Sequence, residues 1–435
     1  MTNRNGCEMY GWAKDLFPIC RSITGPGVRE TLQYIKNELP ELNLLSIKSG
    51  EQVFDWIVPQ EWSIRQAYIS DLNGNRIIDF ANCNLHVVGY SVPINETLPY
   101  KKLEEHLHWL DDMPDAIPYV TSYYSEYWGF CVSKKQKELL EKHEFLKVVI
   151  EADKFDGKLD YAELVIKGEM EKEILISTYI CHPSMANNEL SGPVLAIALA
   201  KWLSSQDYLK YTYRVVFVPE TIGSIVYISK NLHLFKEKIL YGFNLTCVGD
   251  SNNYSLLPTR RGNTYIDKVS KYAMNNYTSS YKEYSFLDRG SDERQYSSPL
   301  VDLDVVSIMR SKYFEYNEYH TSLDNMTFIS EEGLQGSFDI HKKILFIIES
   351  NFIPVNTNYC EPQLGKRNLY PKIGLSKMRS AENLNARNYL NMIAYSDGVN
   401  SILDIATILN VDYFACLECF EILLAEKIIE KKYDC

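Results

Sequence analysis

Long apolar runs are missing from this sequence, since no stretch reaches the ~18–20 residues that cross a membrane. The first ten residues also lack the apolar core of a secretory signal peptide. The ten cysteines are scattered without a regular spacing, so they do not form the framework of a disulfide-stabilised secreted domain. Together these absences predict a soluble protein of the reducing cytoplasm.

An excess of basic residues is also absent. The chain has 45 Lys and Arg against 57 Asp and Glu, a formal net charge of −12. Because nucleic acids and anionic membranes bind proteins largely through positive charge, we expect neither of them as a partner. The sequence also lacks a Gly-x-Ser-x-Gly elbow, a phosphate-binding P-loop and a His-Glu-x-x-His pair, which argues against the enzyme classes that these motifs mark.

Strand and helix patterns alternate between residues 145 and 355. The chain has 435 residues, of which 46% are apolar, and this suffices for a large core and about three domains. Strands are expected at residues 147–151, 161–167, 174–180, 213–218, 240–248 and 304–309. Helices are expected at residues 192–204, 224–231, 263–275 and 331–352. The alternation predicts an α/β fold in which helices cover both faces of a sheet.

The rest of the chain has a different texture. Residues 7–39 have the pattern of two helices, and residues 51–144 combine short β-like runs with hairpin-turn sequences, which predicts a small β-rich insert domain. In the tail, helix patterns at residues 384–394, 401–409 and 413–425 precede a strand at 427–431, which predicts a winged helix. We therefore expect a sheet domain at residues 1–50 and 145–360, the insert at 51–144 and a winged-helix domain at 370–435.

Two histidines lie in polar motifs that are far apart in the chain. His182 follows the strand expected at residues 174–180, and a helix pattern starts soon afterwards at Ser191. His320 lies in Tyr319-His-Thr-Ser-Leu-Asp-Asn325, where Asp324 is expected either to orient an imidazole or to cap a helix that follows Asn325. Residues at the carboxyl end of a parallel strand face the crevice where α/β proteins bind ligands. Two imidazoles with acids nearby therefore predict a zinc site.

These motifs, with Val218-Pro-Glu-Thr-Ile-Gly-Ser224 and Arg289-Gly-Ser-Asp-Glu-Arg294 between them, resemble the zinc aminopeptidases of the bacterial leucyl aminopeptidase type. The sequence is most similar to a bacterial subgroup often encoded near polysaccharide-biosynthesis genes, which also has such an insert and a winged-helix tail. The resemblance covers roughly residues 1–50 and 150–355. It implies a phosphorylase/hydrolase-like sheet domain, with His182 and His320 on the metal and Glu220 as the general base.

Three positions depart from the pattern of this family. The metal-bridging Asp of the family falls on Asn187, the second Glu of its Glu-Glu pair on Thr221, and its strand-end Asp on Thr246. A neutral Asn cannot balance two dications as a carboxylate does, so we expect one zinc ion and not two. Glu189 and Asp250 are the acids expected to replace the missing metal ligands.

From the residues alone, each acid also has a second interpretation. Glu189 is either a ligand or an acid that the dipole favours at the start of the following helix. Asp250, which comes directly after a glycine, has the position of a turn-forming Asp. Glu220 is either a helix cap or a base that accepts a proton from water acidified by zinc, and we favour the base.

Arginines and acids gather in two segments that are expected to border the same crevice. An arginine side chain binds a carboxylate or a phosphate through a two-pronged fork. We therefore assign substrate binding to Arg260, Arg261, Arg289 and Asp292, although a surface ion pair is the more common role of an isolated arginine.

The sequence thus predicts a zinc-dependent hydrolase of an amide bond, whose substrate is a short peptide or an aminoacylated or acylated sugar. The alternative is a degenerate aminopeptidase-like scaffold that binds a ligand or partner without catalysis, and the residues at the three departing positions favour it. We expect the apolar side chains of the tail to pack either against the sheet domain or against a second subunit. The second arrangement would make the protein a homo-oligomer.

The winged-helix tail is predicted not to bind DNA. Residues 400–435 contain seven acidic and three basic residues, and the presumed recognition helix at 413–425 carries two glutamates and no Lys or Arg. A helix in the major groove approaches phosphates on both sides and binds largely through basic side chains. An anisotropy titration with mixed duplex DNA at low salt should show no binding, whereas salt-dependent binding with a Kd of about 1 μM would contradict the prediction.

Overall fold

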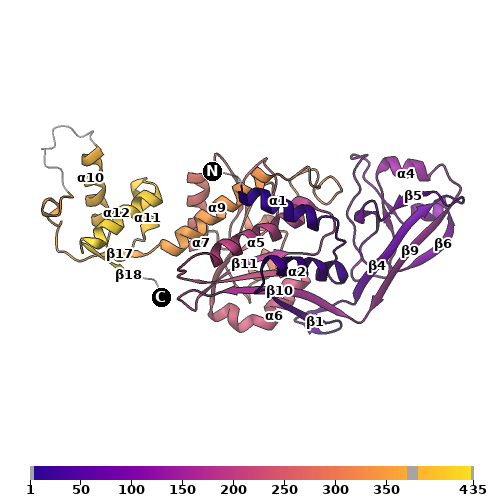
Figure 1. Ribbon diagram of the computed structural model, residues 1–435, viewed down its shortest axis with the longest axis horizontal. Helices are drawn as coiled ribbons and strands as arrows, with labels where there is room; N and C mark the ends of the chain where they lie inside the picture. Colours follow the sequence, from indigo (N-terminus) through magenta and orange to yellow (C-terminus); the bar gives the residue numbers. More distant parts are fainter. Residues whose placement is uncertain (1–3, 370–380, 433–435) are drawn as a thin grey trace. The chain divides into compact units, whose positions relative to one another are not determined.

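An eight-stranded sheet forms the centre of one of the two units into which the chain divides (Figure 1). The structure is a computed structural model that describes residues 4–369 and 381–432. The first unit holds residues 1–268 and 278–341, and the second holds residues 269–277 and 342–435. The strands of the sheet lie in the order β1 (Asn43–Lys48), β10 (Lys158–Ile166), β12 (Thr212–Val218), β11 (Glu173–Tyr179), β13 (Ile239–Leu245), β16 (Val305–Met309), β14 (Ser255–Leu257) and β15 (Lys282–Glu283).

The four middle strands, β12, β11, β13 and β16, run parallel to one another. Every residue of β11, β12 and β16 is buried. Burial on both faces explains why the sequence shows continuous apolar runs here and no alternation of apolar and polar residues. The strands expected at residues 161–167, 174–180, 213–218, 240–248 and 304–309 are confirmed, and the carboxyl ends of the parallel ones meet at one edge.

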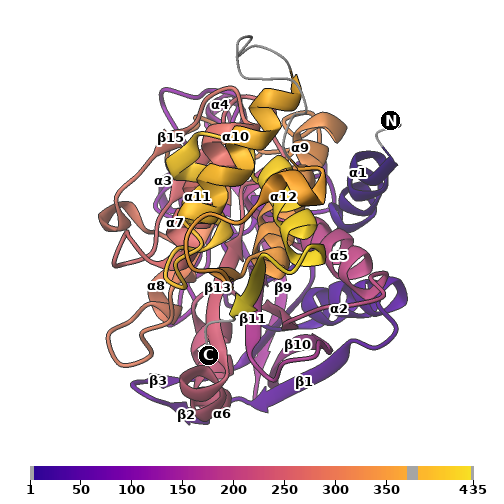
Figure 2. The same cartoon turned by 90° about the vertical axis from the view of Figure 1, so that its left-hand side faces the viewer.

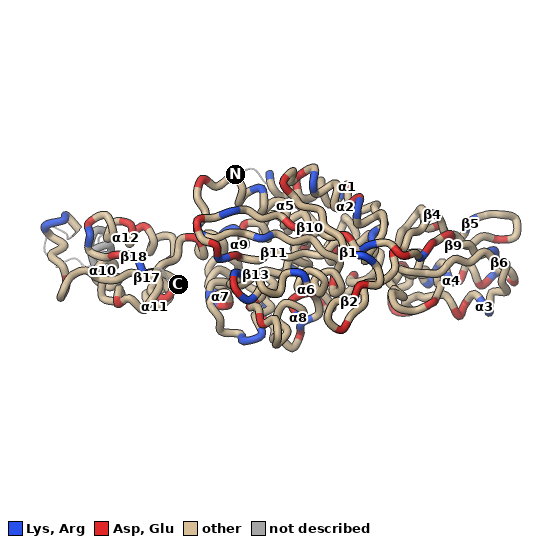
Figure 3. The backbone as a smooth tube through the Cα atoms, turned by 90° about the horizontal axis from the view of Figure 1, so that it is seen from below, with Lys and Arg blue, Asp and Glu red and all other residues tan. Residues whose placement is uncertain are grey.

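Helices cover both faces of this sheet, as expected (Figures 1 and 3). One face carries α1 (Arg4–Leu16), α2 (Pro26–Glu38) and α5 (Ser191–Ser204), and the other carries α6 (Ile222–Glu237) and the short α8 (Glu293–Tyr296). A Cβ atom at Gly192 would collide with the backbone oxygen of Leu245 and the hydroxyl of Thr178, so glycine lets α5 approach the sheet closely. The helices α7 (Tyr265–Tyr277) and α9 (Glu331–Ser350) have residues in both units.

A second, four-stranded antiparallel sheet forms the β-rich part of the first unit. Its strands lie in the order β5 (Arg76–Asp79), β4 (Glu61–Ser70), β9 (Phe145–Phe155) and β6 (Ile94–Pro99). The strand expected at residues 147–151 forms as part of β9, but it pairs with β4 and β6 and not with the large sheet. The β-rich part thus continues past residue 144. The smaller elements are β2 (Gln52–Val53), β3 (Trp56–Ile57), α3 (Tyr100–Glu104), β7 (Leu107–His108), β8 (Phe130–Cys131) and α4 (Lys134–Leu140).

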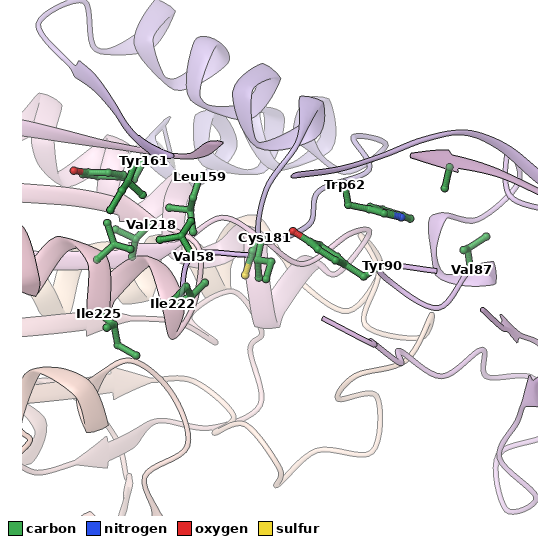
Figure 4. Packing of buried hydrophobic residues seen from close by; sticks show 14 of the residues in the cluster. Val58, Trp62, Val87, Tyr90, Leu159, Tyr161, Cys181, Val218, Ile222 and Ile225 are labelled. Atoms are coloured by element: carbon green, nitrogen blue, oxygen red, sulfur yellow. The ribbon is translucent and has the colours of Figure 1, made fainter. Parts of the chain in front are cut away.

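One apolar core joins the β-rich part to the large sheet (Figure 4). Trp62 and Tyr90 from the β-rich part stack with ring centroids 5.7 Å apart, and they belong to the same buried cluster as Cys181, Val218 and Ile222. These last three residues lie at or just beyond the ends of β11 and β12. The shared core therefore fixes the β-rich part beside the edge of the sheet where the expected site lies.

Besides parts of α7 and α9 and the short η4 (Leu364–Arg367), the described residues of the second unit form the helices α10 (Ala381–Ala394), α11 (Ile402–Leu409) and α12 (Tyr413–Ala425) and a two-stranded sheet (Figures 1 and 2). In this sheet, β17 (Ile353–Asn356) pairs with β18 (Ile429–Lys432). Ser401 and Asp412 accept hydrogen bonds from backbone N–H groups at the starts of α11 and α12, which fixes where both helices begin. The three helices and the strand expected in the tail are confirmed, and residues 370–380 and 433–435 of the expected domain lie outside the described residues.

Within the described ranges, no helix is both long enough and apolar enough to cross a membrane.

Candidate active site

The parallel pairing of β11 with β12 brings two of the predicted residues together. Tyr179 and Val218, the last residues of these strands, lie opposite each other, so the segments that follow leave the sheet side by side. The Nε2 atom of His182 lies 3.6 Å from Oε2 of Glu220. The backbone N–H of Glu220 also donates a hydrogen bond to the sulfur of Cys181, over 3.2 Å. An imidazole and a carboxylate are thus held against each other at the edge of the sheet.

His320 reaches the same place from a loop that the β-rich part holds. Its ring lies 5.4 Å from the ring of His182, measured between centroids. The backbone of His320 has a φ of 55°, a left-handed conformation that a residue with a side chain seldom adopts. Its carbonyl oxygen accepts a hydrogen bond from the N–H of Tyr119, and the ring of Tyr119 lies 5.2 Å from both imidazoles.

Two residues further along, Ser322 completes this short pairing between distant segments. Its N–H donates to the carbonyl oxygen of Ile117, and its hydroxyl accepts a hydrogen bond from the N–H of the same residue. The insert therefore forms one wall of the site and fixes the conformation of the His320 loop. No pattern in the sequence indicated this role of Tyr119, because the pairing joins residues about 200 positions apart.

A cavity of about 340 Å³ lies in front of these groups. His182, Glu220 and His320 line it, together with four aromatic residues of the β-rich part, Trp56, Tyr119, Tyr123 and Tyr124. Its volume is within the range of small-molecule sites. The three residues predicted as metal ligands or general base, His182, Glu220 and His320, are in its wall.

Burial sets the protonation of the two histidines. The pKa of His182 is lowered to about 3 by burial and by the charge of Arg21. The pKa of His320 is also lowered to about 3, by burial and by the neighbouring His182. Both rings are therefore neutral at pH 7, the form in which a ring nitrogen has a free electron pair for a metal. The pKa of Glu220 is raised, first by burial and then by the charge of Asp292.

His182, Glu220 and His320 are residue types that bind zinc, but among the described residues the only three donor atoms that lie within 4.8 Å of one another belong to Cys181, His182 and Glu189. Two neutral imidazoles and an adjacent carboxylate are groups that zinc takes as ligands or as partners of its water. The side-chain oxygen of Asn187 instead accepts hydrogen bonds from the N–H groups of Gly249 and Asp250, at 2.8 and 3.2 Å. The hydroxyl of Thr246 lies 2.6 Å from that of Tyr179 and donates to the carbonyl oxygen of Asn188. Two of the three departing positions are thus neutral side chains bonded into the fold.

The two acids expected as replacement ligands face other groups. Oε2 of Glu189 lies 2.9 Å from Nδ1 of His182, the ring nitrogen other than the one beside Glu220. Together with the sulfur of Cys181 these atoms lie within 4.8 Å of one another, but they already contact each other. Asp250 is fully buried, and its two oxygens accept hydrogen bonds from Ser311, Asn187 and Asn252. Asp250 has the turn-forming place that was its second interpretation.

Asp324 caps a helical turn, but not the helix after Asn325 for which it was expected. Its carboxylate accepts hydrogen bonds from the N–H groups of Asn187 and Asn188, at 2.6 and 2.9 Å, and from the hydroxyl of Tyr316. Asp324 thereby holds η2 (Ala186–Leu190), a single π-helical turn that carries Glu189. Such turns are rare and occur frequently at functional sites.

The four residues assigned to substrate binding lie elsewhere. Arg260 and Arg261 form exposed ion pairs with Asp302 and Asp304, and Arg289 lies over the ring of Phe286. None of the three arginines lines the cavity.

Asp292 is fully buried and is not exposed to a substrate. Its Oδ1 accepts hydrogen bonds from the N–H of Thr221 and the hydroxyl of Ser224, at 2.7 and 2.8 Å. Asp292 therefore supports the start of α6, directly after Glu220, and acts behind the site.

Comparison with known proteins gives matches over most of the chain. The family described as domain of unknown function (DUF4910) matches residues 10–351, and the winged helix-turn-helix family matches residues 352–431. A Clostridium acetobutylicum protein, named as a candidate polysaccharide biosynthesis protein with an aminopeptidase-like domain, is 44% identical over 406 residues, 93% of this chain and 92% of its own.

Solved structures agree with these matches. A crystal structure of a candidate peptidase from Clostridium acetobutylicum has a TM-score of 0.92 at 40% identity and covers 99% of this chain and 97% of its own. The zinc aminopeptidase BSAP from Bacillus subtilis has a TM-score of 0.58 at 15% identity, over 79% of this chain and 95% of its own. At that identity, the likeness to BSAP concerns the fold alone.

The support that Tyr119 gives to this site can be measured. We expect Tyr119→Ala to lower the free energy of unfolding by about 2 kcal/mol, because the ring packs against both imidazoles. Tyr119→Phe keeps the ring and loses only the hydroxyl contact with Tyr123, so it should cost about 1 kcal/mol or less. Tyr124→Ala is the control, because Tyr124 is 59% exposed and its loss should change stability by about 0.5 kcal/mol at most. Urea unfolding measures all three, and equal effects of the two alanine variants would contradict this account.

Proposed function

The chain belongs to the family described as domain of unknown function (DUF4910) and has an aminopeptidase-like fold followed by a winged helix. We propose that it hydrolyses an amide bond with one zinc ion, which His182 and His320 hold, and that Glu220 is the general base. The observation that carries this proposal is the approach of Nε2 of His182 to the carboxylate of Glu220, 3.6 Å, in the wall of the cavity. Neutral imidazoles that face a carboxylate across a cavity are what zinc-assisted hydrolysis requires.

In the proposed reaction, Glu220 transfers a proton and the metal ion activates water. Zinc supplies Lewis acidity, which makes water acidic enough to lose a proton near neutral pH. Glu220 accepts that proton as the water oxygen bonds to the amide carbon. When the bond between carbon and nitrogen breaks, Glu220 returns the proton to the leaving nitrogen, so that a carboxylate and an amine are released. Burial raises the pKa of Glu220 to about 8. The positive charge of bound zinc would therefore be needed to keep Glu220 ionised at neutral pH, and the ionised side chain is a stronger base than an exposed glutamate.

The substrate is a small molecule that enters the aromatic cavity. We propose a short peptide or an aminoacylated or acylated sugar, and the name of the Clostridium acetobutylicum relative favours the sugar. The cavity is lined mainly by aromatic rings and has no Lys or Arg in its wall, which suits an uncharged group next to the amide. The assignment of Arg260, Arg261 and Arg289 to substrate binding is not part of this proposal.

A second candidate is a scaffold that binds a ligand without catalysis. The observation that favours it is the hydrogen bonding of Asn187 and Thr246, which ties two positions of the departing set into the fold. A scaffold of this kind would keep the cavity and bind no metal. Metal content therefore distinguishes the two candidates.

We expect protein purified without chelator to contain about one zinc ion per chain. The double variant His182→Ala/His320→Ala should lose the metal, because it removes both imidazoles. His233→Ala is the control, since the side chain of His233 is 84% exposed and should not affect metal content. Elemental mass spectrometry provides the count. Two tightly bound ions would refute the role given to Asn187, and no ion under any condition would favour the scaffold.

The variant Glu220→Gln should keep the fold and the metal while hydrolysis slows by about 10²–10⁴-fold. Gln has the shape of Glu but cannot accept the proton. Glu237→Gln, at the exposed end of α6, is the matched control and should keep full activity. Release of amine from peptide amides and acylated sugars measures the rate. Loss of zinc from Glu220→Gln would show that Glu220 is a metal ligand, and activity near that of the wild type would remove it from catalysis.

A further inference from the structure

A buried ion pair lies directly behind His182. Arg21, in the loop after α1, and Glu189, in the π-helical turn η2, have no exposed side-chain surface. The Nε atom of Arg21 lies 3.6 Å from Oε1 of Glu189, which is an ion pair but too long for a hydrogen bond. The two residues are 168 positions apart in the sequence, and neither of them lines the cavity.

Both members of the pair hold His182. Oε2 of Glu189 lies 2.9 Å from Nδ1 of His182, within hydrogen-bond distance. Nε of Arg21 donates to the carbonyl oxygen of His182 over 3.0 Å, and Nη1 donates to the carbonyl oxygen of Leu16 over 2.7 Å. His182 is therefore held both at its ring and at its backbone.

The stability of the fold does not account for this pair. Removing two charges from water costs several kcal/mol for each ion, and good geometry is needed to recover that cost. Here Nη2 of Arg21 and Oε1 of Glu189 have no hydrogen-bond partner among the described residues. A buried pair of this kind is often replaced by apolar side chains of similar volume without loss of stability. Its contacts with His182 point to a role in the site.

The contact with Glu189 decides which nitrogen of His182 carries the hydrogen. Burial raises the pKa of Glu189 to about 8, and the charge of Arg21 opposes this rise. Paired with Arg21 as a carboxylate, Glu189 can only accept a hydrogen bond, which places a hydrogen on Nδ1 and leaves the electron pair of a neutral ring on Nε2. Nε2 is the atom next to Glu220 in the cavity wall. The orientation of the ring and the tautomer are both fixed by the group behind it.

We propose that Arg21 and Glu189 are positioning residues, which hold His182 in the Nδ1–H tautomer with Nε2 directed into the cavity. Glu189 holds the ring, and Arg21 holds both Glu189 and the backbone of His182. Insofar as Nε2 binds zinc, this inference rests on the proposed function, but the tautomer is a property of the metal-free chain. Loss of such an orienting group typically lowers metal affinity by about 10–100-fold.

The test uses paired substitutions that leave no buried charge alone. Arg21→Met/Glu189→Leu replaces both ions by apolar groups and should remain folded, with a thermal midpoint near that of the wild type. Arg21→Met/Glu189→Gln restores a neutral acceptor oxygen opposite Nδ1 and should recover the wild-type tautomer. Arg214→Met/Glu173→Leu is the control, because it removes another largely buried Arg–Glu pair, near the amino-terminal ends of β11 and β12 and so at the opposite ends of these strands from His182. Glu163, which Arg214 also contacts, keeps its hydrogen bond from Tyr227.

Two readouts are measured. Nitrogen NMR of the His182 ring in metal-free protein should show Nδ1–H in the wild type, in the control and in the Gln variant, and loss of this preference in the Leu variant. Zinc affinity, measured by competition with a chromogenic chelator, should fall by about 10–100-fold in the Leu variant and largely recover in the Gln variant.

The outcomes separate this inference from the proposed function. A wild-type His182 with its hydrogen on Nε2, or a folded Leu variant with unchanged tautomer, would overturn the inference. If the Leu variant does not fold, the tautomer of His182 in the wild type and in the Gln variant still tests the positioning role. A wild type that binds no zinc would defeat the proposed hydrolase, while the loss and recovery of the Nδ1–H signal would still establish the positioning role.

Discussion

The parallel pairing of β11 with β12 is the constraint on which the rest of the site depends. It places His182 and Glu220, 38 residues apart in the sequence, within 3.6 Å of each other at the carboxyl edge of the sheet. The other parts of the site lie around that pair. The β-rich part supplies Tyr119 and the wall that holds His320, and the segment after α1 supplies Arg21 behind His182. The buried core shared by the two sheets keeps these parts together.

Charge decides how many metal ions this arrangement suits. Two dications close together need carboxylates between them, and Asn187 and Thr246 are neutral and already hydrogen-bonded to the protein. Asp250 and Glu189 do not restore the missing charge, because the first accepts hydrogen bonds from Ser311, Asn187 and Asn252 and the second contacts Nδ1 of His182. What is left facing the cavity is two imidazoles and the side chain of Glu220, and the proposal of a single ion is based on this set.

The sequence was sufficient for the parts of the fold that depend on local patterns. Mainly apolar runs predicted β11 and β12, and helix patterns predicted α5 and the three helices of the tail. The strand β9 was predicted, but not its partners, since periodicity does not say which sheet a strand joins. In the site, His182 and Glu220 were predicted because each comes just after a strand pattern. His320 was predicted because it lies in a short motif that resembles one of the aminopeptidase family.

The remainder depends on contacts that no local pattern encodes. Tyr119 meets His320 and Arg21 meets Glu189 only after distant segments have packed together, so neither pair was foreseen. Arg260 and Arg261 were assigned to the substrate because of their charge, yet exposed acids neutralise them on the surface. Asp292 was placed at the substrate, although its carboxylate is buried at the start of α6. A charged residue in a loop gives no indication of whether it faces a ligand, a surface partner or the interior.

The central claim is a single metal ion at Nε2 of His182, and anomalous X-ray scattering at the zinc edge tests it most directly. Crystals grown with zinc should show one strong anomalous peak per chain, bonded to His182 Nε2 and to His320 and adjacent to Glu220. A second peak beside Asn187, or a peak at Nδ1 of His182 between Cys181 and Glu189, would contradict this account of the site.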